Sequence, residues 1–196
     1  MSERGQFADR SEPLRLAILQ RVVTPYRVAL FRRLSAEPNL DLRVFAGDDL
    51  PNSKVRNADD VSGIDVVRVP TKFIQIGGRT IVHHQGLLSS LADFAPDAIL
   101  TEGESNLLSA LGALRYRLSN PHVAALHWSL GGLPGEPMQR TGLRARLVNL
   151  FRKRFDAFVV YSSYGKDVLR VNGVNPGQVF VATNVADLTK HVKASK

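Results

Sequence analysis

Seven short apolar runs, separated by segments with the length and pattern of helices, constrain the fold of this chain more than any other feature. Most runs are almost continuously apolar, which is typical of parallel strands buried on both faces. The alternation predicts an α/β fold, a Rossmann-like parallel sheet of about seven strands with helices on both faces. The strands are expected to begin at Leu14, Leu40, Ile64, Asp97, His122, Asp156 and Gln178, and the helices to span 26–36, 80–94, 106–118, 138–155 and 164–172.

Serine and glycine residues indicate where some of these helices begin and end. Ser105 and Ser163 are expected to cap the N-termini of two helices, and Gly173 is expected to end one. Residues 1–13 are polar and charged and are expected to form a disordered lead, and 48–63 to form a polar surface loop. The rest of the chain has the length of one compact domain.

The net charge of the chain indicates an anionic partner but does not identify which one. The formal net charge is +8 and the pI is about 10.2, which imply nucleic acid, an acidic lipid surface or a phosphorylated substrate. The chain has no cysteine, so a disulfide or a thiolate metal site is excluded, and we expect neither metal nor cofactor. It shows no signal-peptide pattern and no run near the roughly 18 apolar residues that span a bilayer. These features predict a cytoplasmic protein.

Ligands of such a sheet bind where the carboxyl ends of the strands meet, so the loops that leave the strands hold the candidate residues. The first loop, 20–27, contains no glycine, which argues against a dinucleotide fingerprint and against a P-loop. Tyr26 is either a core residue or a site residue, and Arg27 is the stronger site candidate. Glu102 stands at the exit of the fourth strand, whereas Glu104 suits electrostatic capping of the helix that follows.

Three segments resemble glycosyltransferases with two Rossmann-like domains. The stretch DAFVVYSSYGKDVLRVNGVNPGQVFVATNVAD resembles the closing unit of the N-terminal domain in retaining GT-B enzymes of the glycosyl-group-1 class, family 4. TPYRVALFRRL resembles the start of many bacterial polysaccharide glycosyltransferases, and HW with a nearby glycine resembles a W-x-x-G variant. The resemblance covers about 14–187, and in its last third the matching positions are Ser162 or Ser163, Gly173-Val174, Asn184 and Asp187.

The resemblance implies that 14–187 is the N-terminal, acceptor-side domain of a GT-B enzyme and that 188–196 begins the interdomain linker. It implies transfer of a hexose from a nucleotide-sugar to a saccharide or lipid-linked acceptor. The donor-binding domain is expected to be absent, because no two glutamates show the E-x7-E spacing of that domain. We therefore expect this chain to be inactive alone and to need a donor-binding domain or subunit supplied elsewhere.

The resemblance also assigns residue roles. It implies that His127 is catalytic, in the cleft beside the donor sugar, although a lone histidine at a strand end is more often structural. A neutral imidazole can exchange hydrogen bonds with a sugar hydroxyl, and an indole can stack on a pyranose unless it packs in the core. The expected acceptor-binding residues are Tyr26, Arg27, Glu102, Trp128 and the glycines of a mobile lip, Gly131 and Gly132.

The segment 138–155 carries six basic residues and no acidic one. Leu143, Leu147, Leu150, Phe151 and Phe155 form an apolar stripe expected to face the core. The opposite, cationic side is either simply solvated or docks on anionic lipid at the inner face of the membrane. The membrane-facing candidates are Arg140, Arg144, Arg146, Arg152 and Lys153.

Two other classes of function compete with a transferase. A non-catalytic binding module could recruit a partner or an anionic membrane through its basic surface. A nucleic-acid-binding domain is a weaker candidate, because no basic run is interleaved with aromatic residues on a sheet face.

Overall fold

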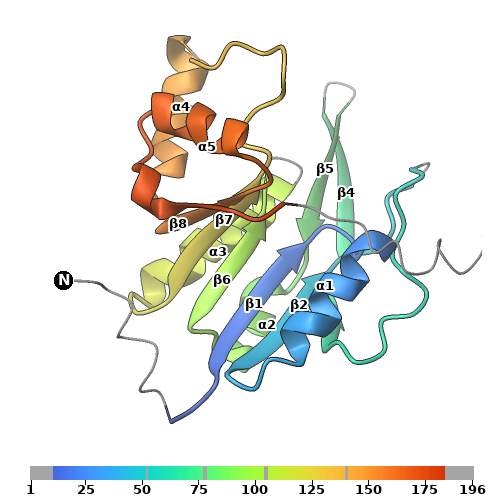
Figure 1. The fold of residues 1–196 in the computed structure, drawn as a ribbon. Coiled ribbons are helices and arrows are strands. Elements are labelled where there is room, and N and C mark those ends of the chain that lie inside the picture. The colour runs from blue at the N-terminus through green and yellow to red at the C-terminus, as the bar shows by residue number, and fades with distance from the viewer. Residues whose placement is uncertain (1–10, 52, 77–78, 104–105, 140, 184–196) are drawn as a thin grey trace, which may run out of the picture.

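The computed structural model describes residues 11–51, 53–76, 79–103, 106–139 and 141–183. Within these, seven parallel strands form one sheet, which confirms the predicted fold class (Figure 1). Each of the seven apolar runs contains one of these strands. They are β1 (Leu14–Gln20), β2 (Leu40–Ala46), β3 (Val66–Arg68), β6 (Ala98–Glu102), β7 (Ala124–Ser129), β8 (Ala157–Val160) and β9 (Val179–Val181).

The order of the strands is β3-β2-β1-β6-β7-β8-β9. Starting from β1, strands β2 and β3 are added in sequence order on one side. Strands β6, β7, β8 and β9 are added in sequence order on the other side. Leu16 of β1 pairs with Leu42 of β2 on one side and with Ala98 of β6 on the other. The direction of winding reverses between β1 and β6, which is where ligands of open α/β sheets bind.

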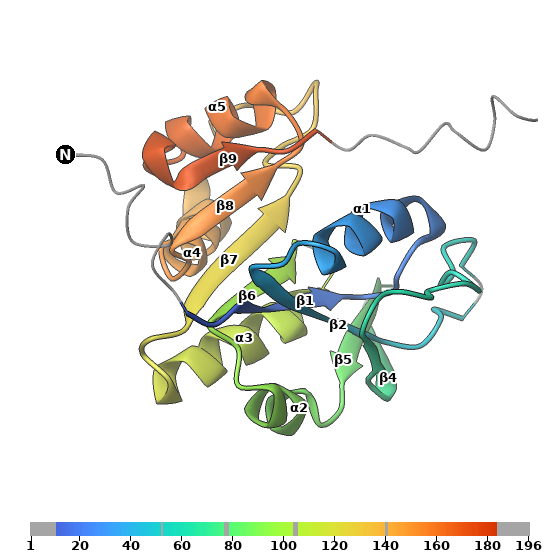
Figure 2. The same ribbon diagram turned by 60° about the horizontal axis from the view of Figure 1, so that its bottom comes forward.

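Helices cover the two faces of the sheet unequally (Figure 2). On β1, Ile18 packs with Val28 and Phe31 of α1, whereas its neighbours Ala17 and Leu19 pack in the cluster that contains α2. A third cluster joins β7 and β8 to α3 and α5 on the α2 face. The helices are α1 (Pro25–Ser35), α2 (Leu87–Phe94), α3 (Leu107–Ser119), α4 (Gly142–Arg152) and α5 (Ser163–Val171), with a short 3-10 helix at Pro176–Gln178.

One predicted helix is wrong over its first part. The helix expected at 80–94 is α2 only from Leu87; before it, β5 (Arg79–His84) pairs antiparallel with β4 (Thr71–Ile76). The sequence contains a signal for this hairpin, since Gly77-Gly78 separates the largely apolar run FIQI from the β-branched run TIV.

Other boundaries differ by a few residues. α4 begins at Gly142 instead of 138, because Thr141 is extended and Gly142 has a left-handed φ of 89°, so a helix cannot run through them from 138. The cap of α5 is Ser162 instead of Ser163, since the Ser162 hydroxyl accepts a bond from the Gly165 N–H at 3.1 Å. Gly173 follows the end of α5 with φ of 89°, as predicted. Residues 1–10, Ser105, Asn184, Asp187 and 188–196 lie outside the described residues.

Candidate functional site

Arg27 lies at the winding reversal and joins three elements there. Pro25 opens α1, which places Arg27 in its first turn beside the carboxyl ends of β1 and β6. One guanidinium nitrogen, Nη1, donates to the side-chain oxygen of Gln20 and, at 2.9 Å, to Glu102 Oε1. The other, Nη2, donates to the Tyr161 hydroxyl at 2.9 Å. Arg27 therefore ties α1 to β1, to β6 and to the residue that follows β8.

Aromatic rings surround the same guanidinium. Its central carbon lies 4.8 Å from the centre of the Trp128 ring and 5.6 Å from that of Tyr26. Trp128 and Tyr161 lie side by side, with ring centres 5.8 Å apart. We call the set of Gln20, Tyr26, Arg27, Glu102, Trp128 and Tyr161 the Arg27 cluster. Four predicted site residues, Tyr26, Arg27, Glu102 and Trp128, are thus brought together.

The surroundings of two groups of the cluster, Arg27 and Tyr161, favour their protonated forms. Burial acts to lower the pKa of Arg27, but Glu102, Tyr161 and Tyr26 outweigh it, so the pKa is raised. The pKa of Tyr161 is also raised, chiefly because burial disfavours the phenolate. Arg27 is therefore a permanent cation that Glu102 pairs, and Tyr161 keeps its proton at neutral pH.

The cluster also has unused hydrogen-bonding capacity. Among the described residues, two buried atoms of the cluster, Arg27 Nε and Trp128 Nε1, have no hydrogen-bond partner, and neither has Oγ1 of Thr24, which precedes α1. Such atoms are normally satisfied by water or ligand oxygens. Tyr26 is 44% exposed, so the Arg27 cluster reaches the protein surface at this residue. A site with a paired cation and an exposed aromatic ring is suited to hydroxyl-rich ligands.

His127 does not face a cleft, and the expected orientation is wrong. His127 is 5% exposed, and its ring centre lies 4.8 Å from that of Phe155 and 6.2 and 6.0 Å from those of Phe151 and Phe158. Nδ1 lies 3.1 Å from the Thr101 hydroxyl. Burial, with Arg152 nearby, lowers the pKa of His127 to about 4. The contacts are those of a neutral core histidine.

Gly131 and Gly132 lie against α5 instead of forming an open lip. A Cβ built on Gly131 would lie 2.5 Å from the Gly165 carbonyl oxygen, and φ at Gly131 is 74°. A Cβ on Gly132 would lie 3.0 Å from a methyl group of Val168. Both glycines allow the loop after β7 to approach α5 closely.

The helix α4 is turned differently from the prediction. Leu143, Leu147 and Leu150, expected in the core, are 74%, 58% and 59% exposed, although Phe155 is buried as expected. Arg152, expected to face a membrane, is 3% exposed. Arg146 and Lys153 are exposed, whereas Arg140 and the side chain of Arg144 lie outside the described residues.

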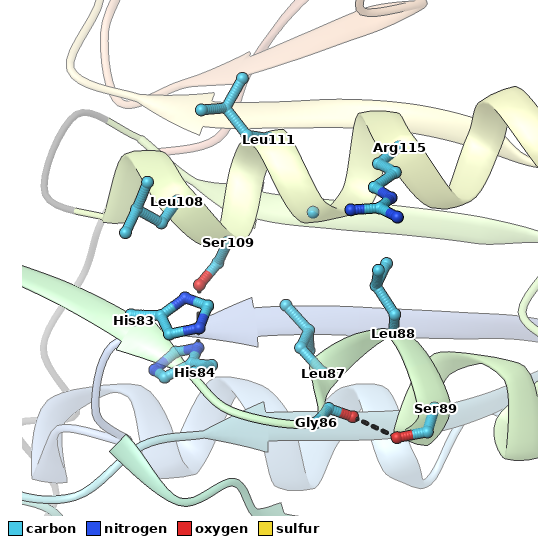
Figure 3. A pocket seen from close by; sticks show the side chains of 11 residues that line it. His83, His84, Gly86, Leu87, Leu88, Ser89, Leu108, Ser109, Leu111 and Arg115 are labelled. Atoms are coloured by element: carbon cyan, nitrogen blue, oxygen red, sulfur yellow. Dashed lines mark hydrogen bonds between the residues drawn. The ribbon is translucent and has the colours of Figure 1, made fainter. Parts of the chain in front are cut away.

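A pocket of about 410 Å³ was not predicted. It lies between β5, α2 and α3, with apolar walls from Leu87, Leu88 and Leu111 (Figure 3). At its base the Ser109 hydroxyl donates to Asn106 Oδ1 at 2.7 Å and lies 2.8 Å from His84 Nδ1. Burial lowers the pKa of His84 to about 4, so this histidine is neutral at pH 7. Among the described residues, no three His, Cys, Asp or Glu side chains are placed to hold a metal ion.

Two members of the Arg27 cluster, Gln20 and Tyr161, were missed from the sequence. Both stand at the end of an apolar run, Gln20 as the last residue of β1 and Tyr161 directly after β8. A polar side chain at the carboxyl end of a buried strand is the signal that could have found them.

The fold and the cluster define a Rossmann-like domain with its polar site at the carboxyl edge, the kind of domain of which GT-B enzymes have two. Solved structures share the fold. Alr3699/HepE from Anabaena, in complex with UDP and glucose, is 11% identical with a TM-score of 0.55, over 89% of this chain and 45% of its own. The lipopolysaccharide outer core galactosyltransferase WaaB is 12% identical with a TM-score of 0.55, over 90% and 47%.

A third similar structure, UDP-N-acetylglucosamine 2-epimerase from Rickettsia bellii, is 13% identical with a TM-score of 0.51, over 93% of this chain and 47% of its own. The chain thus spans about half the length of each of these proteins. No curated protein matches the sequence.

The family model of Glycosyltransferase Family 4 matches residues 26–190. The chain therefore belongs to Glycosyltransferase Family 4, as its sequence resemblance predicts. The matched region contains every member of the Arg27 cluster except Gln20.

Proposed function

We propose that this chain is the acceptor-side half of a retaining glycosyltransferase of the bacterial polysaccharide type. It binds a saccharide or lipid-linked acceptor in the cytoplasm, and a second domain or subunit supplies the nucleotide-sugar. The observation that carries the proposal is the position of the Arg27 cluster at the winding reversal, where ligands of this sheet topology bind.

The chemistry of the cluster supports a neutral sugar as ligand. Because Glu102 pairs Arg27 at 2.9 Å, the buried cation is already compensated and does not require an anionic ligand. The Tyr26 ring offers an exposed apolar face, and hydroxyl groups can both donate to Glu102 and accept from Tyr161. These groups would hold the acceptor while the donor half contributes the leaving phosphate and its stabilisation.

The experiment is saccharide binding by the 196-residue chain, screened on a glycan array and measured by calorimetry. The chain is expected to bind an acceptor saccharide and to show no affinity for UDP- or GDP-sugars. Tyr26→Ala is expected to weaken saccharide binding at least tenfold, since stacking on the exposed ring is lost. Leu30→Ala is the matched control, because Leu30 is 41% exposed on the same helix one turn later.

Two outcomes would overturn the proposal. Tight, specific binding of a nucleotide-sugar would place the donor site in this chain. No saccharide bound at all, with partners captured only through basic residues, would favour the non-catalytic binding module.

A further inference from the structure

The pocket between β5, α2 and α3 is lined along one side by a single face of α3. Leu108, Gly112 and Arg115 follow the i, i+4, i+7 spacing of that face, so α3 offers an apolar side chain, an open position and a cation. Like the other described helices, neither α2 nor α3 is long and apolar enough to cross a membrane. At about 410 Å³, the pocket has the size of a small-molecule site.

Gly112 keeps part of this space open. A glycine inside a helix is less favourable than an alanine, and Gly112 lies in the interior of α3. Among the described residues outside the α3 backbone, a Cβ built on it would meet only Leu87 Cδ2, at 3.4 Å, which is an ordinary contact. The packing therefore does not require a glycine here. Its missing side chain leaves the room beside Leu87.

The base of the pocket can accept one further hydrogen bond. The Ser109 hydroxyl donates its single hydrogen to Asn106 Oδ1, so it accepts from His84 Nδ1, which lies 2.8 Å away and carries the proton of the ring. One lone pair of the Ser109 oxygen remains for another donor. Ser109 and His84 are both buried and both line the pocket, so a donor that reaches this oxygen enters through the pocket.

The mouth of the pocket is cationic. Arg115 is exposed, and no carboxylate of the described residues pairs with it. Its side chain extends from α3 toward Leu88 of α2 (Figure 3). His83 is the other basic residue of the lining, which contains no acidic residue. An anionic group is therefore expected at the mouth, and the planar guanidinium is suited to a carboxylate.

We propose that this pocket binds a small hydroxyaryl carboxylate. The carboxylate pairs with Arg115, the ring lies against Leu87 and Leu88 in the room left by Gly112, and the hydroxyl donates to Ser109 at the base. Ser109 and Arg115 are six positions apart on α3, about 9 Å along the helix axis. A ligand with one ring between its hydroxyl and its carboxylate spans such a separation.

The pocket is separate from the Arg27 cluster. Leu87 packs with Ala17 and Leu19 on one face of the sheet, whereas Trp128 of the cluster packs with Ile18 on the other face. Binding of the acid requires neither saccharide nor nucleotide-sugar. It therefore stands or fails independently of the proposed acceptor site.

The test is an NMR titration of the 196-residue chain with 4-hydroxyphenylacetate. Phenylacetate, which lacks the hydroxyl, is expected to bind about threefold to tenfold more weakly, because one hydrogen bond is lost. The uncharged 4-hydroxyphenylethanol is expected to bind at least about tenfold more weakly, because the charge-assisted bonds to Arg115 are lost.

Two variants probe the two ends of the argument. Arg115→Gln should lower the affinity for 4-hydroxyphenylacetate to that for the alcohol, and Gly112→Leu should abolish binding because its side chain fills the pocket. Arg33→Gln is the matched control, since it removes an exposed cation from α1 on the other face of the sheet, and it should bind as the unaltered chain does. The melting temperature of each variant is measured. Arg115 is exposed, so its substitution tests the site even where Gly112→Leu does not fold.

Three outcomes would overturn the proposal. They are no response to either acid, equal affinity for the alcohol and the acids, and binding that Arg115→Gln leaves unchanged. Displacement of the acid by a saccharide that the chain binds would show that the pocket is part of the acceptor site, and would overturn the claim of a separate site.

Discussion

Glu102 uses its two carboxylate oxygens to hold Arg27 and the backbone of Arg21 at once. Oε1 accepts from the Arg27 guanidinium and Oε2 from the Arg21 N–H, each at 2.9 Å. Glu102 ends β6, whereas both partners follow β1, so one side chain joins the two strands at the winding reversal. The bond between Arg27 and Glu102 is therefore both a support of the fold and a part of the candidate site.

Glu102→Gln is expected to destabilise the fold by about 2–3 kcal/mol, because it leaves the buried Arg27 cation without a compensating charge. The free energy of unfolding in urea measures this. Asp41→Asn is the matched control, since its partner Arg15 is 39% exposed at the side chain and an exposed pair contributes about 0–1 kcal/mol. Equal losses from the two substitutions would show that the Arg27 pair is no stronger than a surface pair.

His127→Ala is expected to lower the free energy of unfolding by about 2–4 kcal/mol, since it opens a cavity among three phenylalanine rings. Thermal unfolding should show a melting temperature lower by several degrees. His83→Ala, at an exposed position of β5, should leave it unchanged. A stable His127→Ala domain would instead support the catalytic role that the sequence resemblance implies, and activity of the complete enzyme would then be the next measurement.

Acid is expected to destabilise the domain through its two buried histidines, His84 and His127. The folded-state pKa values of His84 and His127 are lowered to about 4 from the ordinary 6.5, so the unfolded chain binds protons that the folded chain does not. Stability is complete above about pH 6.5 and falls as the pH drops toward 4, by about 2–3 kcal/mol per histidine at pH 4.5.

Urea unfolding between pH 7 and 4.5 measures that slope. Because the carboxylates of Asp49 and Asp60 have lowered pKa values, their pairing is lost only below this window. His84→Gln is expected to remove about half of the pH dependence. A slope that is the same in this variant would show that the pKa of His84 does not differ between the folded and the unfolded chain.

Gly131→Ala is expected to cost more than 2 kcal/mol, because its new methyl group would overlap the Gly165 backbone in addition to the strain of a positive φ. Gly135→Ala has a similar φ, 89°, with nothing within 4 Å, and should cost about 1 kcal/mol. Urea unfolding of the two variants separates packing from strain. Similar losses would show that the loop after β7 can move away from α5.

The parallel sheet could be predicted because strands buried on both faces leave continuous apolar runs, and all seven were found. The hairpin of β4 and β5 was missed because the length of 80–94 favoured one helix over a strand and a shorter helix. The orientation of α4 could not be read from its periodicity. The sequence of 138–155 contains two groups of apolar residues, and either group could face the core. In the structure Phe151 and Phe155 pack with residues of α3, whereas Leu143, Leu147 and Leu150 are exposed.

The candidate site was predicted in part for a general reason. Residues at the carboxyl ends of parallel strands share one edge, so Glu102, Trp128 and the loop with Arg27 could be placed together. His127 could not belong to the same site, because neighbouring residues of a strand point to opposite faces and Trp128 takes the face of α1. The bonds from Arg27 to Gln20 and Tyr161 depend on side-chain directions that no spacing rule gives.

The position of β1 between β2 and β6 has a consequence for how the chain acquires its structure. β1 pairs on one side with β2, which is near in the sequence. On its other side it pairs with β6, which is far away in the sequence: Leu16 pairs with Ala98. The chain loses the conformational entropy of closing this long loop before the stabilising contacts form, and such long-range pairing is associated with slow folding. Until β6 pairs with β1, Arg27 lacks its carboxylate partner Glu102, so we expect the polar site at the carboxyl edge to form only after this long-range pairing.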